Sequence, residues 1–362
     1  MNTSSTFKTT FSALLLAGCF NTAAFAQNEI GSDFLDVNNI KATINANGHL
    51  FGSLLNIPEN EKNGFEIKNT DGKHAVRIGG LWMGGKEGTK YHLNAPTFGV
   101  WGRDVYQGPV MKQEYYNATE DAKWNRVWKV SKETIKNHIS NFASKDYVTP
   151  EEILNWPASG DIQKGQSPNL APFVDVNSNG IYDPQNGDYP SIKGDQAILF
   201  IYNDHRGQHT ESVGTYPMGV EVIGLAYAFA NPFNKTYNNT IFVDFTIINR
   251  SGIDYTDAKL GVFTDIDLGI ATDEYQGFDL KRSTYYGYNV DNKTEKFGRN
   301  PNPFMSVTLM NEPFSGYMTY NNDCDINGNP IMPMDYYFYL NGYWKDGMAI
   351  TKGGNGKGGN TH

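Results

Sequence analysis

The second half of the chain carries the hydrophobic patterns of several β-strands. Residues 240–249 have apolar side chains at every second position, which predicts a strand with one face in the core. These positions are Ile241, Val243, Phe245 and Ile247. Residues 197–202 and 220–229 are apolar almost throughout, as expected for central strands buried on both faces, and residues 259–263 add another strand.

Residues 35–110 contain shorter strand-like runs with glycine-rich breaks. The alternating run 40–44 and the apolar run 50–55 flank Asn47-Gly48, a dipeptide that favours a hairpin turn. A further run, residues 75–83, ends at Gly84-Gly85. These runs predict a small sheet in the N-terminal part of the chain.

Residues 128–156 interrupt the strand patterns with helical ones. Apolar residues at mixed helical spacing within 128–142 predict a first helix. Thr149 as N-cap and Pro150 at the first helical position, followed by two acids, predict a second, short helix that ends at Trp156. This helical pair is expected to connect two β regions.

The sequence therefore predicts a mainly β protein with two β-sandwich-like or jelly-roll-like regions joined by a short helical connector. An aromatic content of 14% and 38 glycines fit strands joined by turns. The expected divisions are a signal peptide at 1–26, an N-terminal β region at 27–127, a helical connector at 128–160, an acidic segment resembling a calcium loop at 161–195, a β-sandwich domain at 196–350 and a glycine-rich tail at 351–362.

The first 26 residues have the layout of an export signal. A short apolar run at 11–20 follows Lys8, and Ala24-Phe25-Ala26 supplies small residues for cleavage after Ala26. A run of about ten residues is too short to span a bilayer. A rival signal lies within it, because Leu16-Ala17-Gly18-Cys19 has the form of a lipobox that would attach a lipid to Cys19. Both interpretations take the chain out of the cytoplasm.

Charge and cysteine content restrict the possible partners. The formal net charge is −9 and the basic residues are scattered, which argues against nucleic-acid binding. Cleavage after Ala26 would leave Cys324 as the single cysteine, so no intramolecular disulfide is expected. Since no second apolar segment approaches membrane-spanning length, the mature chain has no predicted transmembrane segment.

The most specific chemical signal is an acidic loop with oxygen-bearing side chains at positions 1, 3 and 5, a glycine at 6 and an acid at 9. These residues are Asp175, Asn177, Asn179, Gly180 and Asp183. Calcium takes six to eight hard oxygen ligands, and the glycine permits the sharp turn around the ion. Asn186 replaces the bidentate glutamate of an EF-hand, and Asp188 is the candidate substitute. We expect a structural calcium site of dockerin-like or thrombospondin-repeat-like type, with a run of Asx turns as the alternative.

Two further acidic segments could bind a cation. The first contains Asp265, Asp267, Asp273 and Asp279, with Glu274 among them. Carboxylates this close in sequence repel one another unless they are solvated or bridged by a cation, so the alternatives are a metal site and a solvated loop. The second, residues 323–328, repeats only the first half of the calcium pattern.

Catalytic motifs are poorly represented. His205 and His209 are four positions apart, but the glutamate of a zinc-protease motif is missing, which favours surface or turn histidines. No nucleophile elbow, phosphate-binding loop or redox motif is present. The six tryptophans are interpreted as core residues, with a sugar-binding platform as the alternative; they are Trp82, Trp101, Trp124, Trp128, Trp156 and Trp344. The sequence thus favours a non-enzymatic role.

An ordered series of short motifs along the mature chain carries a family resemblance. The motifs are LDVNNIKATI at 35–44, GGLWMGG at 79–85, WPASG at 156–160, the acidic loop 175–190, KGDQ at 193–196, YND at 202–204, GVE at 219–221, DIDLG at 265–269, YWKDG at 343–347 and GGNG at 353–356. In this series the chain resembles uncharacterised secreted β-rich proteins of Bacteroidota, many of which are cargo of the type IX secretion system. The resemblance implies an extracellular or cell-surface protein, although similar proteins continue into a C-terminal sorting domain that this sequence does not show.

The leading hypothesis is an exported, calcium-stabilised surface module for adhesion or interaction with an unknown partner. The alternative is an extracellular protein that binds glycans, or hydrolyses them with a carboxylate pair drawn from residues 265–279. We expect an extracellular or cell-surface location, with the periplasm or a lipid-anchored outer-membrane location as alternatives.

Overall fold

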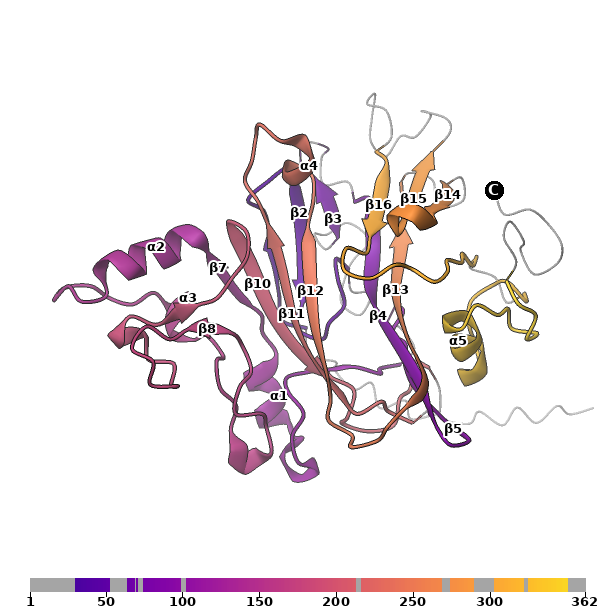
Figure 1. Ribbon diagram of the computed structural model, residues 1–362, viewed down its shortest axis with the longest axis horizontal. Helices are drawn as coiled ribbons and strands as arrows, with labels where there is room; N and C mark the ends of the chain where they lie inside the picture. The colour runs from indigo at the N-terminus through magenta and orange to yellow at the C-terminus, as the bar shows by residue number, and fades with distance from the viewer. Residues whose placement is uncertain are drawn as a thin grey trace, which may run out of the picture.

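The computed structural model describes residues 30–52, 64–68, 70, 74–98, 102–212, 216–268, 274–289, 303–321 and 325–350. Antiparallel strands dominate these residues (Figure 1), which confirms the prediction of a mainly β protein. The predicted signal peptide, Cys19 and the glycine-rich tail lie outside the described residues, as do Trp101, Asp273 and residues 322–324.

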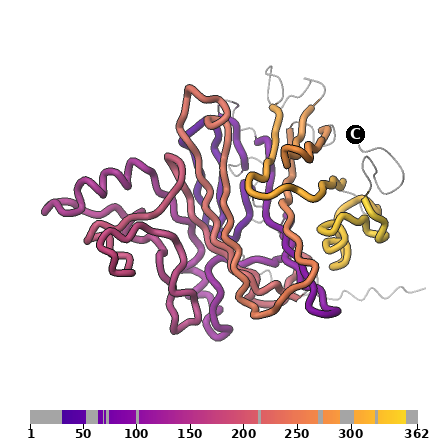
Figure 2. The backbone as a smooth tube through the Cα atoms, in the orientation of Figure 1, coloured from indigo at the N-terminus to yellow at the C-terminus, as the bar shows by residue number. Residues whose placement is uncertain are grey.

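The elements follow one another along the chain as Figure 2 traces it. The strands are β1 (Ser32–Leu35), β2 (Ile40–Asn45), β3 (Phe65–Ile67), β4 (Val76–Glu87), β5 (Lys90–Asn94), β6 (Tyr106–Gln107), β7 (Trp128–Ser131), β8 (Phe173–Val174), β9 (Tyr189–Pro190), β10 (Gln196–Asn203), β11 (Val220–Ala228), β12 (Phe242–Asn249), β13 (Thr256–Ile266), β14 (Glu274–Asp279), β15 (Thr284–Asn289) and β16 (Met305–Thr308). The α-helices are α1 (Ala118–Trp124), α2 (Lys132–Asn141), α3 (Glu151–Leu154), α4 (Lys235–Asn238) and α5 (Pro333–Leu340). Short 3₁₀ turns are η1 (Gln113–Tyr115), η2 (Ile162–Lys164), η3 (Pro184–Asn186) and η4 (Leu280–Arg282).

One sheet has the order β12-β11-β10-β6, and β7 also pairs with β10. Its three long strands are those predicted from residues 197–202, 220–229 and 240–249, so these predictions are confirmed. Separate sheets have the orders β13-β4-β5, β1-β2-β3 and β14-β15-β16, and Leu50 bridges β2 to β4.

Strands from the two predicted β regions are paired with each other. Residues of β4 pair with β13, so residues 76–87 and 256–266 lie side by side in one sheet (Figure 1). β6 and β7 likewise pair with β10. The two regions therefore share sheets, which differs from the predicted arrangement of two sandwiches in succession.

Strand β10 lies between two hydrophobic clusters, one on each of its faces. Its side chains alternate between two hydrophobic clusters, with Ile198 and Phe200 in one and Leu199 and Ile201 in the other. All of these side chains are at most 1% exposed. Since β10 is covered on both faces, its apolar residues need no alternation with polar ones.

The hairpin predicted at Asn47-Gly48 is a tight turn after β2, closed by a bridge between Ile44 and Leu50. Gly48 has a φ of 86°, and a Cβ there would lie 2.5 Å from the ring of Tyr202. Both the backbone conformation and the close approach therefore require glycine.

The helical connector begins later than predicted. Residues Trp128–Ser131 form β7, which pairs with β10, and α2 starts only at Lys132. The Ser131 hydroxyl caps this helix by accepting a hydrogen bond from the Thr134 N–H at 3.0 Å. The second helix, α3, starts at Glu151, one residue after Pro150, and the Thr149 cap is not formed. No helix among the described residues is long and apolar enough to cross a membrane.

We predict that the buried imidazole of His49 makes the fold acid-sensitive. Burial lowers the pKa of His49 to about 4 from 6.5. Because the unfolded chain binds the proton more readily, stability should be lost as the pH falls from 6.5 toward 4, by about 1.4 kcal/mol per pH unit and about 3 kcal/mol in all. Denaturant unfolding at pH 7 and pH 4 measures the loss. His49→Asn, which removes the titration, should reduce the pH slope, and equal slopes for both proteins would refute the assignment.

Candidate functional site

Strands β8 and β9 close the acidic loop. Phe173 pairs with Pro190 and Val174 with Tyr189, so residues 175–188 leave and re-enter the fold at one point. The backbone turns at Gly180 and Gly187, which have φ values of 78° and 104°. Glycine adopts these conformations without strain, which allows the loop to fold back on itself.

Asp183 is the centre of the side-chain contacts in this loop. Its carboxylate accepts hydrogen bonds from the amide groups of Asn186 at 2.8 Å, Asn179 at 3.0 Å and Asn177 at 3.2 Å. The Asn186 amide donor is the main cause that holds the pKa of Asp183 below its usual range. The structure thus brings three of the predicted site residues and Asn186 together.

Asp175 reaches the same cluster through the backbone. Its carboxylate accepts hydrogen bonds from the N–H groups of Asn179 at 3.2 Å and Gly180 at 2.7 Å. The side-chain oxygens of Asn177 and Asn179 each accept from the N–H two residues later. The Asx turns of the alternative hypothesis are therefore present, and they fold the predicted oxygen ligands onto one another.

These residues suit a hard cation only in part. Two carboxylates and two side-chain amides offer the oxygens that calcium prefers. In the part of the chain that the structure describes, no group of three or more His, Cys, Asp or Glu side chains is placed to hold a metal ion. A calcium ion in this loop would therefore depend on amide and backbone oxygens beside Asp175 and Asp183.

Asp188, predicted as a possible calcium ligand, is instead buried and bound to backbone N–H groups. Its side chain is 0% exposed, and its two oxygens accept hydrogen bonds from the N–H groups of Val176 at 2.8 Å and Asp183 at 3.0 Å. Its carbonyl contacts the His138 ring at 3.1 Å. Asp188, at the end of the loop, therefore holds the start and the middle of the loop together and contacts helix α2, which is a positioning role.

The acids predicted as a second cluster are spread along two strands. Asp265 lies in β13, whereas Asp279 lies at the end of β14, about 17 Å along that strand from Glu274. Arg282 forms an ion pair with Asp279 and lowers the pKa of this carboxyl. Asp279 therefore does not join a shared metal site with Glu274, whose carboxylate accepts a hydrogen bond from the Leu268 N–H. Asp267 donates its backbone N–H to Ala75, and Asp273 lies outside the described residues.

A buried cluster of two aspartates and a histidine was not predicted. His209 is 0% exposed, with ring nitrogens 3.7 Å from carboxylate oxygens of Asp104 and Asp204. Of the predicted alternatives, a surface or a turn histidine, the surface position is therefore wrong for His209. Asp204 also accepts hydrogen bonds from the N–H groups of Met218 and Val220, and its burial raises its pKa. The Asp104–His209 pair joins segments about 100 residues apart, so no local sequence signal could reveal it, whereas Asp204 is only five positions from His209.

His205 lies in different surroundings. It is partly exposed and lines a shallow groove of about 520 Å³ together with Lys112 and Arg250. Lys112 donates a hydrogen bond to the carbonyl of Gln163, and Arg250 donates one to the carbonyl of Gly165. Both cations are therefore held by the backbone at residues 163–165.

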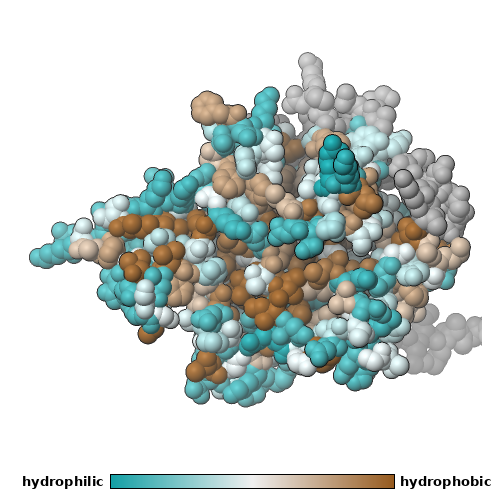
Figure 3. All heavy atoms as spheres, viewed as in Figure 1, coloured by the Kyte–Doolittle hydropathy of each residue, from teal (hydrophilic) through white to brown (hydrophobic). Residues whose placement is uncertain are grey.

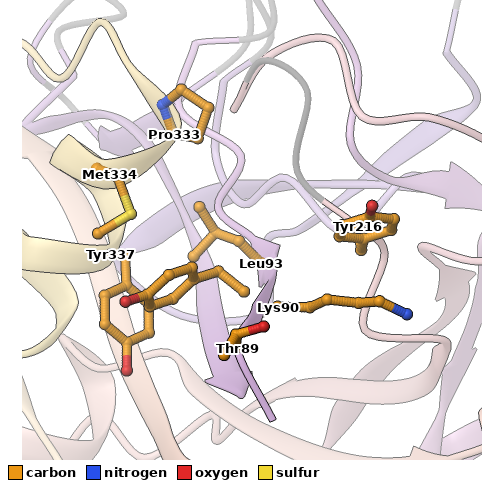
Figure 4. A pocket seen from close by; sticks show the side chains of 8 residues that line it. Thr89, Lys90, Leu93, Tyr216, Pro333, Met334 and Tyr337 are labelled. Atoms are coloured by element: carbon orange, nitrogen blue, oxygen red, sulfur yellow. The ribbon is translucent and has the colours of Figure 1, made fainter. Parts of the chain in front are cut away.

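The five described tryptophans pack in hydrophobic clusters, with Trp124 only partly buried. Trp82, Trp128, Trp156 and Trp344 are at most 6% exposed. Tyrosines instead line a surface groove of about 270 Å³ between the β4–β5 hairpin and α5. Figure 4 shows Tyr337 and Tyr216 on opposite sides of this groove, with Leu93 between them. Tyr216 is 54% exposed.

Comparison with known proteins gives no relative for this chain. No family model, curated protein or solved structure matches it. The chemistry of the acidic loop and of the tyrosine groove is therefore inferred from their own residues.

We predict that Asp188→Asn destabilises the protein even when a chelator is present. An amide presents only one acceptor, so one of the two N–H groups that Asp188 now satisfies loses its partner, at a cost of about 2 kcal/mol. Denaturant unfolding in chelator measures this loss. The matched control is Asp146→Asn at an exposed position outside the loop, and an equal stability of the two variants would contradict the positioning role.

Proposed function

We propose that this chain is an exported, non-enzymatic module for adhesion or interaction at the cell surface, with a structural calcium ion in the loop 175–188. The observation that supports calcium is the convergence of Asp175 and Asp183 on Asn179. The backbone N–H of Asn179 donates to the Asp175 carboxylate, and its side-chain amide donates to the Asp183 carboxylate. The export signal and the resemblance to secreted proteins of Bacteroidota support an extracellular location. A periplasmic protein, or one anchored by lipid at Cys19, follows from the same signals.

The ion would act by neutralising the two carboxylates of an otherwise exposed loop. The ion would be held by the side-chain oxygens of Asp175, Asn177, Asn179 and Asp183. These oxygens would give up hydrogen bonds from N–H groups and bind the cation instead. Asp188 would transmit this order to the fold, since it ties the loop to the backbone beside β8 and β9. The result would be a rigid surface loop suited to recognition.

We expect calcium to raise the thermal unfolding midpoint of the protein. An ion at 100 times its dissociation constant stabilises the folded state by about 2.7 kcal/mol, which is enough for a measurable shift. The midpoint is measured in millimolar calcium and again in chelator. Asp183→Ala should abolish most of the difference between these two conditions.

The exposed residue Asp146 provides the matched control, because Asp146→Ala removes the same charge outside the loop. This variant should keep the full response to calcium. If the native protein shows the same midpoint in calcium and in chelator, the loop is held by its Asx turns alone and the calcium proposal fails.

A second candidate function is glycan binding in the tyrosine groove. Its lining is largely aromatic and aliphatic, with Lys90 5.5 Å from the centre of the Tyr216 ring. Tyrosine rings combine an apolar face with a polar hydroxyl, which suits the mixed surface of a sugar. The volume of about 270 Å³ favours a short segment of a chain rather than a large ligand.

For this candidate we predict that Tyr216→Ala weakens glycan binding about tenfold, which corresponds to about 1.4 kcal/mol. A glycan array selects the sugar, and titration calorimetry measures its affinity. Tyr275→Ala removes a comparably exposed ring from β14, outside the groove, and should leave the affinity unchanged. An array without a signal would count against this candidate.

A further inference from the structure

The groove beside His205 carries basic side chains where four segments of the chain meet. It is lined by Val110, Met111, Lys112, Gly165, His205, Asn249, Arg250 and Gly252. No acidic side chain among the described residues lines it. Its volume of about 520 Å³ is in the range of small-ligand sites. In Figure 3, hydrophilic residues gather along the lower border of the visible face, where the turn between β12 and β13 lies in Figure 1.

Two cations of this groove are bonded to neutral partners. The Lys112 ammonium donates to the Gln163 carbonyl at 2.9 Å. The Arg250 guanidinium donates to the Gly165 carbonyl at 3.3 Å. Both carbonyls belong to the turn around η2, so the two cations lie close to each other. Neither forms an ion pair within the part of the chain that the structure describes.

The neighbouring cations differ, because each has an acidic partner. Lys164 lies 2.7 Å from a carboxylate oxygen of Glu120, and Arg206 pairs with Asp121. The chain also has 39 acids against 30 bases, so carboxylates are plentiful as partners. An unpaired lysine and an unpaired arginine in one groove are therefore a local exception, and they leave positive charge for a ligand.

One acid lies beneath the groove without neutralising it. Glu221 is 0% exposed, and its carboxylate accepts a hydrogen bond from the Val110 N–H at 2.8 Å. Burial raises the pKa of Glu221, against the opposing effects of this N–H group and of the Arg250 charge. The carboxyl therefore belongs to the interior, and the Arg250 guanidinium stays available at the surface.

Both cations keep donors for a ligand. An ammonium has three N–H donors and a guanidinium five, arranged in a planar fork. Hydrogen bonds within the described residues use one donor of each side chain. The ring of His205, which is partly exposed, has no hydrogen bond among these residues. A guanidinium fork fits the two oxygens of a carboxylate, and an ammonium adds a point charge.

We propose that this groove binds a carboxylate-bearing sugar, namely a uronic acid residue of an acidic glycan. Arg250 and Lys112 would hold the carboxylate, and the ring nitrogens of His205 would bond to sugar hydroxyls. This site is separate from the calcium loop and from the tyrosine groove, and it goes beyond the proposed function.

The net charge and the lining favour this ligand over other anions. A chain with a net charge of −9 repels polyanions at long range, so a ligand with isolated carboxylates is preferred to a nucleic acid. A peptide commonly docks along a strand edge or in an apolar groove. The lining comes mostly from connecting segments and offers side-chain donors instead, which suit a sugar.

Titration calorimetry with trigalacturonate in calcium-free buffer tests the proposal. We expect binding that is lost with the methyl ester of this sugar, because the ester keeps the rings but not the charges. Arg250→Gln and Lys112→Gln should each weaken binding about tenfold. Glutamine can still donate to the carbonyls at residues 163–165, so both variants should keep the thermal midpoint. Lys235→Gln removes an exposed cation on α4, outside the groove, and should leave the affinity unchanged.

Weaker binding by both groove variants at an unchanged thermal midpoint supports the proposal. No detectable binding of trigalacturonate at millimolar concentration overturns it, and so does equal affinity for the methyl ester or native affinity in both groove variants. Triglutamate bound as tightly as trigalacturonate overturns the sugar and assigns the groove to acidic peptides. None of these results depends on calcium, so failure here is distinguishable from failure of the proposed calcium site.

Discussion

The burial of β10 on both faces is the constraint on which the layers depend. Phe200 and Tyr202 pack into the cluster that includes residues of β1 and β2, while Leu199 and Ile201 pack into the cluster that includes Ile135 and Trp156 of the helical segment. A strand with no face toward water must have neighbours on both edges and covers on both sides. β11 pairs with one edge of β10, and β6 and β7 pair with the other. The other sheets and the helical segment cover the two faces of β10.

The strands with a clear local pattern could be predicted because hydrophobic periodicity is a property of consecutive residues. The alternation in residues 240–249 and the continuous run in 197–202 both correspond to observed strands. The pairing of β4 with β13 could not be predicted, since no local pattern in either strand indicates which strand it pairs with. β7 was expected to be helical because four residues are too few to establish a period of two.

The acidic loop was predictable for a related reason. Asx side chains at alternate positions bond to backbone N–H groups two or more residues later, so their spacing encodes the local fold. The role of Asp188 depends on the closure of the loop by β8 and β9, which spacing alone does not express. The spread of Asp265 and Asp279 arises because an intervening strand carries nearby sequence positions apart.

The pairing of β4 with β13 also determines when the protein can fold. Ile266 pairs with Val76 and Thr256 with Lys86, so the partners are 170 to 190 positions apart. At synthesis rates of about 5–20 residues per second, β4 waits roughly 10–40 s for its neighbour to be made. During that time the last five residues of the twelve-residue strand β4 can pair with β5, but its edge toward β13 stays open. The second half of the chain must therefore be made before β4 can complete its sheet, and we expect slow folding because these contacts are distant in sequence.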